Sequence, residues 1–113
     1  MSLEALWTVE LFSYQGGGLG GVLVLEKGRA YGGDGAYYYL GTYAVEGDLF
    51  SCTITVTYYN SANRQYAVFG EREKFRMSLK GKVDQQEMQL EGHIEGEPNQ
   101  SIQVSCVKRE ALP

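Results

Sequence analysis

The sequence predicts an all-β fold, a small antiparallel up-and-down barrel of about eight strands with at most one short helix. Three observations lead to this prediction. Apolar and polar residues alternate with period two over long stretches, 15 glycines punctuate those stretches, and no long amphipathic helix is evident. An antiparallel sheet of this length tends to close on itself, which removes its edges. We expect the 113 residues to form one domain, residues 1–113.

The first strand is expected over Leu6–Tyr14, where Trp7, Val9 and Leu11 share one face. The glycine-rich run Gln15–Gly21 follows and is expected to form a hairpin loop. It contains the spacing G-x-G-x-x-G, which binds a dinucleotide only where a helix follows it. A β-prone run of valine and leucine follows here instead, so we expect a turn and no cofactor.

The rest of the chain is organised around Gly28–Gly41, which holds five glycines and four tyrosines. Glycine permits sharp turns and close approach of two backbones, and tyrosine supplies a large apolar area. We therefore expect two short strands that meet at a corner formed by Gly32–Gly35. Consecutive residues of a strand point to opposite faces, so at least one of Tyr37, Tyr38 and Tyr39 must lie outside.

After this corner Thr42–Val45 is expected to continue a strand, which ends at a turn formed by Glu46–Asp48. Leu49–Tyr59 then has the most regular alternation in the chain. Its even positions are apolar or aromatic, and serine or threonine occupies the odd positions 51 to 57. The polar stretch Asn60–Tyr66 connects this strand to the following one and could hold the one short helical turn.

Charge aligns the two strands that follow. From residue 72 the even positions are mostly basic, and from residue 87 the odd positions are mostly acidic. A turn at Asp84–Gln85 sets Lys82 opposite Glu87 and also sets Leu79 opposite Leu90. A slip of one residue would invert both faces, so the pattern predicts this hairpin and its register.

The last strand is expected over Ser101–Lys108, after a break in the ladder at Pro98 and Asn99. Cys106 in this strand and Cys52 earlier in the chain both fall on apolar faces, and they lack C-x-x-C spacing. We expect two buried, reduced thiols rather than a disulfide or a metal site.

Composition limits the classes of partner. The formal net charge is −4 and the isoelectric point is about 4.9, whereas phosphate-backbone binding needs a concentrated basic face. No apolar run approaches the roughly 20 residues that span a bilayer, and no signal-peptide pattern is present. We therefore expect a cytoplasmic protein that contacts neither nucleic acid nor membrane directly.

Catalytic and metal-binding patterns are missing from the sequence. The one histidine, His93, is expected on a charged outer face, as a solvated cross-strand partner of Arg76. No serine has nucleophile-elbow context, and Glu95 and Glu97 are expected to point outward toward cations. The prediction is a protein that is not an enzyme and that uses no metal and no cofactor.

A spaced set of glycine, aspartate and tyrosine residues follows the strand that ends in Val22–Gly28: Gly32, Gly33, Asp34, Tyr39 and Gly41. This set resembles the GrlR family, small bacterial negative regulators of type III secretion genes, and the similarity is clearest over Leu6–Tyr59. The resemblance implies a lipocalin-like barrel that forms a homodimer. It also implies a role in transcription regulation, in which the protein binds and restrains an activator; the type of activator expected is a helix-turn-helix protein.

The resemblance further implies a partner-binding loop at Ala44–Asp48, where Glu46 and Asp48 are acidic. A plain hairpin turn explains the same two residues. A second hypothesis is a lipocalin-like carrier or sensor of a small apolar ligand, with a filled core as its alternative. The residues that would line its cavity are Val9, Leu11, Phe50, Ile54, Val56, Phe75, Met77, Ile94 and Val104.

Overall fold

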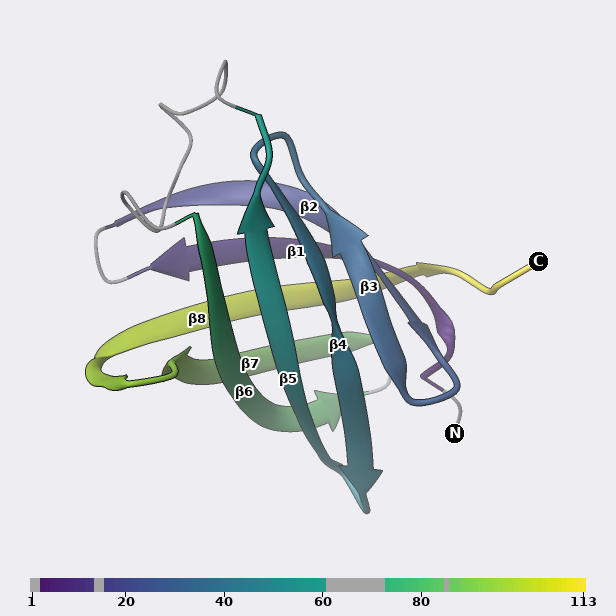
Figure 1. Ribbon diagram of the computed structural model, residues 1–113. Helices are drawn as coiled ribbons and strands as arrows, with labels where there is room; N and C mark the ends of the chain where they lie inside the picture. The colour runs from purple at the N-terminus through teal and green to yellow at the C-terminus, as the bar shows by residue number, and fades with distance from the viewer. Residues whose placement is uncertain (1–2, 14–15, 61–72, 85) are drawn as a thin grey trace.

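The computed structural model describes residues 3–13, 16–60, 73–84 and 86–113, and in it the chain forms a closed antiparallel barrel (Figure 1). The strands pair in the order of the chain, and the last strand pairs with the first. They are β1 (Ala5–Ser13), β2 (Gly16–Glu26), β3 (Arg29–Gly33), β4 (Tyr37–Glu46), β5 (Leu49–Tyr58), β6 (Lys74–Asp84), β7 (Glu87–Ile94) and β8 (Glu97–Glu110). The predicted all-β barrel is confirmed, and the described residues contain no helix.

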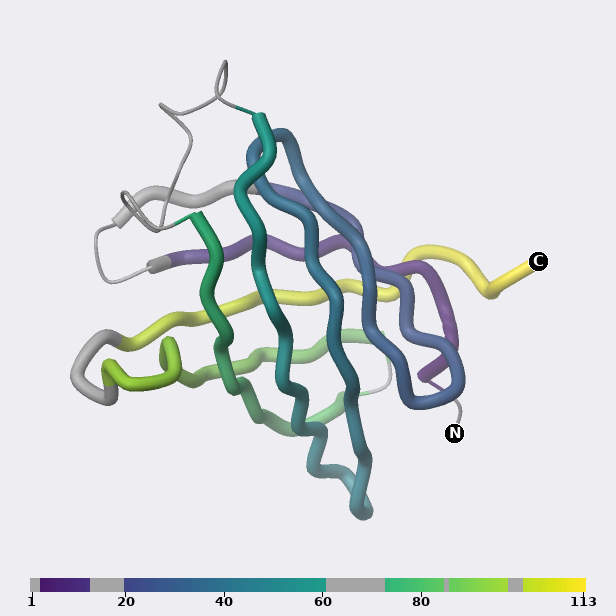
Figure 2. Tube along the Cα trace, in the orientation of Figure 1, coloured from purple at the N-terminus to yellow at the C-terminus, as the bar shows by residue number. Residues whose placement is uncertain are grey.

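The barrel is flattened into two layers. Figure 2 shows β3, β4 and β5 side by side in front, while β1, β7 and β8 cross behind them at a wide angle. Apart from Asn60, the connection predicted over Asn60–Tyr66 lies outside the described residues.

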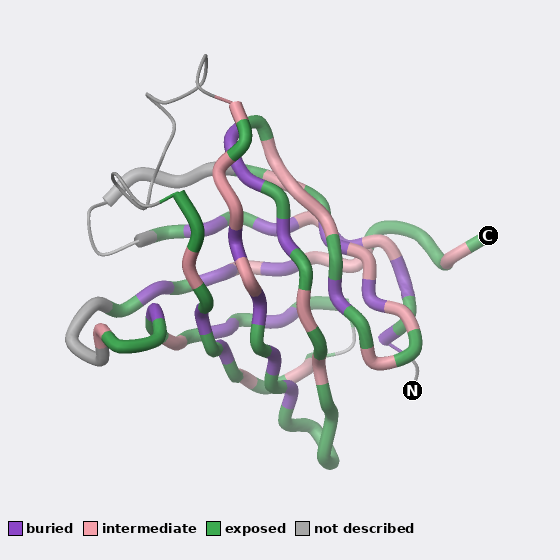
Figure 3. Tube along the Cα trace, in the orientation of Figure 1, coloured by how far each residue is buried: buried purple, intermediate pink, exposed green. Residues whose placement is uncertain are grey.

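Alternating side chains fill the middle of the barrel, as the period-two pattern predicts. Trp7, Val9 and Leu11 of β1 are all buried. Along β5, even positions from Phe50 to Val56 are buried and the intervening serine and threonine side chains face outward or are half-buried. Figure 3 shows the same alternation of buried and exposed residues along the strands.

The prediction of a loop over Gln15–Gly21 is wrong, because β2 begins at Gly16 and pairs with β1 along its length. A side chain at Gly21 would bring its Cβ to 2.7 Å from the carbonyl oxygen of Gly33. This glycine is therefore explained by close approach of two backbones rather than by a turn. The strand assignment leaves no helix after the G-x-G-x-x-G spacing.

The predicted hairpin of β6 and β7 forms, but its register differs by two residues. Lys80 lies opposite Glu91, and Asp84 lies opposite Glu87, so the turn is one residue later than predicted. The expected pairs Lys82–Glu87 and Leu79–Leu90 are therefore wrong. A shift of two keeps every side chain on its own face, so alternation alone cannot distinguish the two registers.

His93 lies opposite Ser78 and Ser101, and not opposite Arg76 as predicted. Arg76 instead forms an ion pair with Glu95, with 3.7 Å between Nη1 and Oε2. Both side chains are more than half exposed, so this pair contributes little to stability.

The chain reverses into β8 at the turn that contains Gly96, whose φ is +87°. β8 begins at Glu97, before the proline where a break was predicted. The pairing with β7 jumps from Ile94–Glu97 to His93–Ser101, so residues 98–100 fall in an irregularity of the ladder. The predicted break is thus an interruption of the pairing and not the end of a strand.

Candidate functional site

The predicted corner between β3 and β4 is organised by the carboxylate of Asp34. Its Oδ1 accepts backbone N–H bonds from Ala36 at 2.7 Å and from Tyr37 at 2.8 Å. Its Oδ2 accepts the hydroxyl hydrogen of Tyr39. The backbone N–H of Asp34 also donates to the carbonyl of Tyr37 at 2.9 Å. One carboxylate therefore satisfies three donors and closes the turn.

The end of β5 is tied to the same corner. The Tyr59 hydroxyl donates to the Asp34 carbonyl at 2.8 Å, and the Tyr59 N–H donates to the Ala36 carbonyl at 2.9 Å. The Asn60 side-chain amide donates to the Gly35 carbonyl at 3.2 Å. These bonds hold the start of β4 against the end of β5.

The remaining residues of the glycine, aspartate and tyrosine motif have structural roles as well. A Cβ on Gly32 would overlap the carbonyl oxygen of Val22, and a Cβ on Gly41 would overlap that of Thr53. Gly33 would place its Cβ 3.0 Å from the carbonyl oxygen of Tyr37. Burial, together with the bond to Asp34, raises the pKa of Tyr39, so its hydroxyl stays protonated and donates. The motif is accounted for by the corner and by close backbone packing.

The predicted partner-binding residues lie at the tip of the β4–β5 hairpin. Glu46 and Asp48 are exposed and flank Gly47, whose φ of +63° makes the turn. Val45 is 42% exposed and Leu49 is 44% exposed, so two apolar side chains accompany the acidic ones. Within the described part of the chain, neither carboxylate has a hydrogen-bond or ion-pair partner.

One backbone contact anchors this tip to the barrel. The N–H of Val83 in β6 donates to the carbonyl of Asp48 at 2.8 Å. Lys82 lies opposite Leu49 in the β5–β6 register. The tip is therefore held in a defined position while its acidic and apolar side chains remain accessible, which is the arrangement that a docking surface needs.

The interior of the barrel is almost completely filled. Its cavity is about 20 Å³, and a single water needs about 10–15 Å³. Of the nine residues predicted to line a cavity, five do so: Val9, Leu11, Ile54, Met77 and Val104. The other four, Phe50, Val56, Phe75 and Ile94, pack in or against the core away from it.

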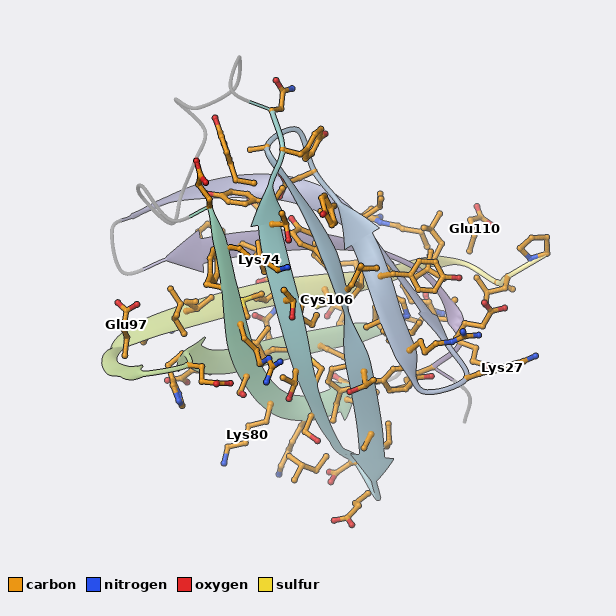
Figure 4. All side chains as sticks on the ribbon, viewed as in Figure 1. Lys27, Lys74, Lys80, Glu97, Cys106 and Glu110 are labelled. Atoms are coloured by element: carbon orange, nitrogen blue, oxygen red, sulfur yellow. The ribbon has the colours of Figure 1, made fainter. Side chains whose placement is uncertain are left out.

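The prediction missed several residues that line this small cavity: Leu23, Tyr39, Cys52, Leu79, Leu90 and Cys106. Strand alternation was the signal that could have found Cys52, which lies between two predicted lining positions on β5. Both cysteines are free and buried, as predicted, and Figure 4 shows Cys106 within the barrel. Burial raises the pKa of the Cys52 and Cys106 thiols to about 12, so both are protonated at neutral pH.

An exposed apolar face crosses β2, β3 and β4. It consists of Val22, Tyr31, Tyr38 and Leu40, with Tyr59 beside it. Tyr31 lies opposite Leu40, and the rings of Tyr38 and Tyr59 are 6.3 Å apart between centroids. Tyr38 is the outward member of the three consecutive tyrosines. Leu40 was missed because its type suggests a core position, although its place in the alternation indicates the outer face.

His93 is exposed on the outer surface, between two serine side chains of neighbouring strands. In the described ranges no three histidine, cysteine, aspartate or glutamate side chains are grouped so that they could hold a metal ion. The described segments also include no helix of the length and hydropathy that crossing a membrane requires.

Comparison of the chain with models of known protein families gives no match, and comparison with curated proteins gives none either.

Proposed function

We propose that this protein is a non-enzymatic interaction protein of the bacterial cytoplasm that binds a transcriptional activator and restrains it. The observation that carries the proposal is the contrast between a filled interior and a structured, accessible hairpin tip. A cavity of about 20 Å³ offers no room for an apolar ligand. A partner therefore binds at the outer surface, and the hairpin tip exposes four side chains together: Val45, Glu46, Asp48 and Leu49.

The resemblance to the GrlR family supports the finer parts of this proposal: a helix-turn-helix activator as the partner and type III secretion genes as the regulated process. Negative net charge supports a protein partner rather than DNA. An acidic surface can compete with DNA for the basic face of an activator, because both present negative charge. The protein would then lower transcription without contacting the promoter.

The homodimer forms, in this proposal, through the exposed apolar face of Val22, Tyr31, Tyr38 and Leu40. Contiguous apolar patches on a soluble protein mark interaction sites, and tyrosine is enriched in interfaces. Sedimentation velocity of the wild-type chain is expected to show a dimer, and Leu40→Lys with Tyr38→Lys to show a monomer. A wild-type monomer at about 100 µM, well above the Kd of ordinary dimers, would refute this part.

The function is tested with a tagged chain expressed in its own bacterial host, with bound proteins identified by mass spectrometry. A DNA-binding activator is expected among them, and its purified form should lose affinity for its promoter when the wild-type chain is added. Glu46→Ala with Asp48→Ala should restore promoter binding. The matched control is Glu87→Ala with Glu91→Ala, two exposed carboxylates on another strand. Equal inhibition by the wild-type chain and the tip variant would overturn the role of the tip.

A further inference from the structure

The strand β4 extends beyond its neighbour on one side. The pairing of β3 with β4 ends at Arg29 opposite Thr42, and one further bond joins the Tyr43 N–H to the Gly28 carbonyl at 2.9 Å. β4 continues to Glu46, and its other neighbour, β5, pairs with it as far as the tip. Figure 1 shows this hairpin projecting past the end of β3. Among the described strands, none covers this edge of β4 past Tyr43.

The direction of the backbone groups along this edge follows from two bonds. The Tyr43 N–H points toward β3, and the Tyr59 N–H of β5 points toward β4, where it reaches Ala36. In an antiparallel ladder the direction of these groups alternates along each strand. The backbone groups of Ala44 and Glu46 therefore face β5, where these residues lie opposite Ser51 and Leu49. The N–H and C=O of Val45, between them, point to the uncovered side.

The side chains do not protect this edge. Proteins block exposed strand edges with proline, lysine, bulges or a covering element, and Tyr43–Glu46 contains one charge and none of these devices. Val45 is on the inward side of β4 yet is 42% exposed; β5 lies on one side of it, and no described strand lies on the other. Tyr43 beside it is held by stacking on Phe50, with 5.5 Å between ring centroids.

Charge selects the occupant of this edge. Antiparallel pairing with a second copy, centred on Val45, would set Glu46 of each copy opposite Ala44 of the other. It would be limited to these few residues, because Gly28 already occupies the position beside Tyr43. A basic segment gains from the carboxylates of Glu46 and Asp48 and can continue past the tip. The cations Lys27 and Arg29 lie at the other end of the edge, next to Gly28. The occupant therefore carries its cation at the end that faces the tip.

We propose that the edge of β4 from Tyr43 to Glu46 receives an extended segment of the partner as an added β-strand. Apolar residues of the segment pack beside Tyr43 and Val45, and an alternating lysine or arginine faces Glu46 and Asp48. Backbone bonds to Val45 supply affinity, and the alternation supplies specificity. This inference rests on the proposed function, since it describes how the partner of the tip is held.

The probe is a blocked synthetic heptapeptide in which valine alternates with threonine and lysine. It is titrated into the purified full chain, and amide hydrogen exchange is followed by NMR. The lysine peptide should slow exchange at Val45. The same peptide with glutamate for lysine should bind about tenfold more weakly, and the lysine peptide N-methylated at its central residue should give no protection. Protection elsewhere with none at Val45, or no binding by the lysine peptide, would overturn the edge site.

Matched variants separate the backbone from the side chain. Val45→Pro removes an N–H that no described strand uses, so the barrel should keep its circular dichroism spectrum while peptide affinity falls about tenfold. Val45→Thr keeps that N–H and should change affinity less than about threefold. Ala44→Pro removes an N–H that pairs with β5 and should lower Tm. This result would confirm that the Ala44 backbone faces β5 and that the Val45 backbone faces the open side. Unchanged affinity in Val45→Pro would overturn the proposal.

Two further outcomes distinguish this inference from the function on which it rests. If Val45→Pro still inhibits the activator while Glu46→Ala with Asp48→Ala does not, the function stands and strand addition is wrong. If the tip variant inhibits as the wild-type chain does, the function itself fails. A wild-type dimer that Val45→Pro converts to a monomer would show that a second copy occupies the edge, and this would also overturn the proposal.

Discussion

β4 begins at the Asp34 corner, where the carboxylate satisfies three donors, and ends at the hairpin tip, where Val45, Glu46 and Asp48 are exposed. The first region contains the spaced glycine, aspartate and tyrosine motif, and its residues are explained by hydrogen bonding and backbone packing. The second region has no comparable motif, and in it the backbone groups of Val45 and the carboxylates of Glu46 and Asp48 face solvent. The difference teaches that a motif can be fully used in building a fold, while the surface proposed for docking lies at the other end of the same strand.

Alkaline pH should have the largest effect, and it acts on the buried region. Burial raises the pKa of the Cys52 and Cys106 thiols from 9.0 to about 12. The fold therefore favours the protonated thiols, and this stability is fully present below pH 9 and lost as pH rises toward 12. Ionising one buried thiol costs the fold on the order of 4 kcal/mol, which is a large part of a typical stability of about 5–15 kcal/mol. The buried Tyr39 hydroxyl, whose pKa is also raised, adds to the loss.

Thermal melts between pH 8 and 12, followed by circular dichroism, measure this loss. The variant Cys52→Ala with Cys106→Ala should lose less of its own neutral-pH stability over the same interval. An equal loss in the variant and the wild-type chain would show that the thiols are not the groups responsible.

Glycine substitutions should give the next largest effect and sharpen the contrast along β4. Gly41→Ala places a Cβ into the backbone of Thr53 and Ile54 and should cost about 3 kcal/mol of unfolding free energy. Gly47→Ala meets no atom within 4 Å, although its φ of +63° is strained for alanine, and should cost about 1 kcal/mol. Urea unfolding of both variants measures the difference. Equal costs would contradict the close approach at Gly41.

Asp34→Asn should cost about 2 kcal/mol, because an amide N–H₂ then faces the buried hydroxyl of Tyr39 in place of an accepting oxygen. The matched substitution at the tip, Asp48→Asn, should change stability by less than about 0.5 kcal/mol, since its carboxylate is exposed. Denaturant unfolding of the two variants tests whether Asp34, at the start of β4, contributes more to stability than Asp48, just beyond its end. Equal losses in the two variants would contradict the role of Asp34 in closing the corner.

The smallest effect on stability is expected for Glu46→Ala with Asp48→Ala, within about 0.5 kcal/mol of the wild-type chain. The same variant should weaken binding of the activator. A large loss of stability would mean that the two carboxylates hold the turn, and the hairpin explanation of these residues would then replace the docking one.

The sequence predicts strands and faces well and their registers poorly. Alternation identified the buried faces of β1 and β5, because polar and apolar residues change with the period of a strand. It could not fix β6 against β7, where a shift of two residues leaves Lys80 and Glu91 on the same outer face. The loop predicted before Gly21 failed for a different reason. Glycine permits both a turn and close backbone approach, and only the tertiary pairing with β1 and β3 decides between them.

The candidate site was predictable in part. The turn at Glu46–Asp48 follows from its residue types, and exposure of its carboxylates follows from the turn. The uncovered edge of β4 was not predictable, because it depends on where β3 ends relative to β4, at Arg29 opposite Thr42. The exposed apolar face of Tyr31, Tyr38 and Leu40 likewise needs the register of two strands.

Native-state amide hydrogen exchange of the free chain tests the contrast along β4 most directly. The amides of Ala36 and Tyr37, which donate to Asp34, and that of Ala44, which pairs with β5, should be strongly protected. The Val45 amide should exchange near the rate of an unstructured peptide. Protection of Val45 equal to that of Ala44 in the free monomer would contradict an uncovered edge.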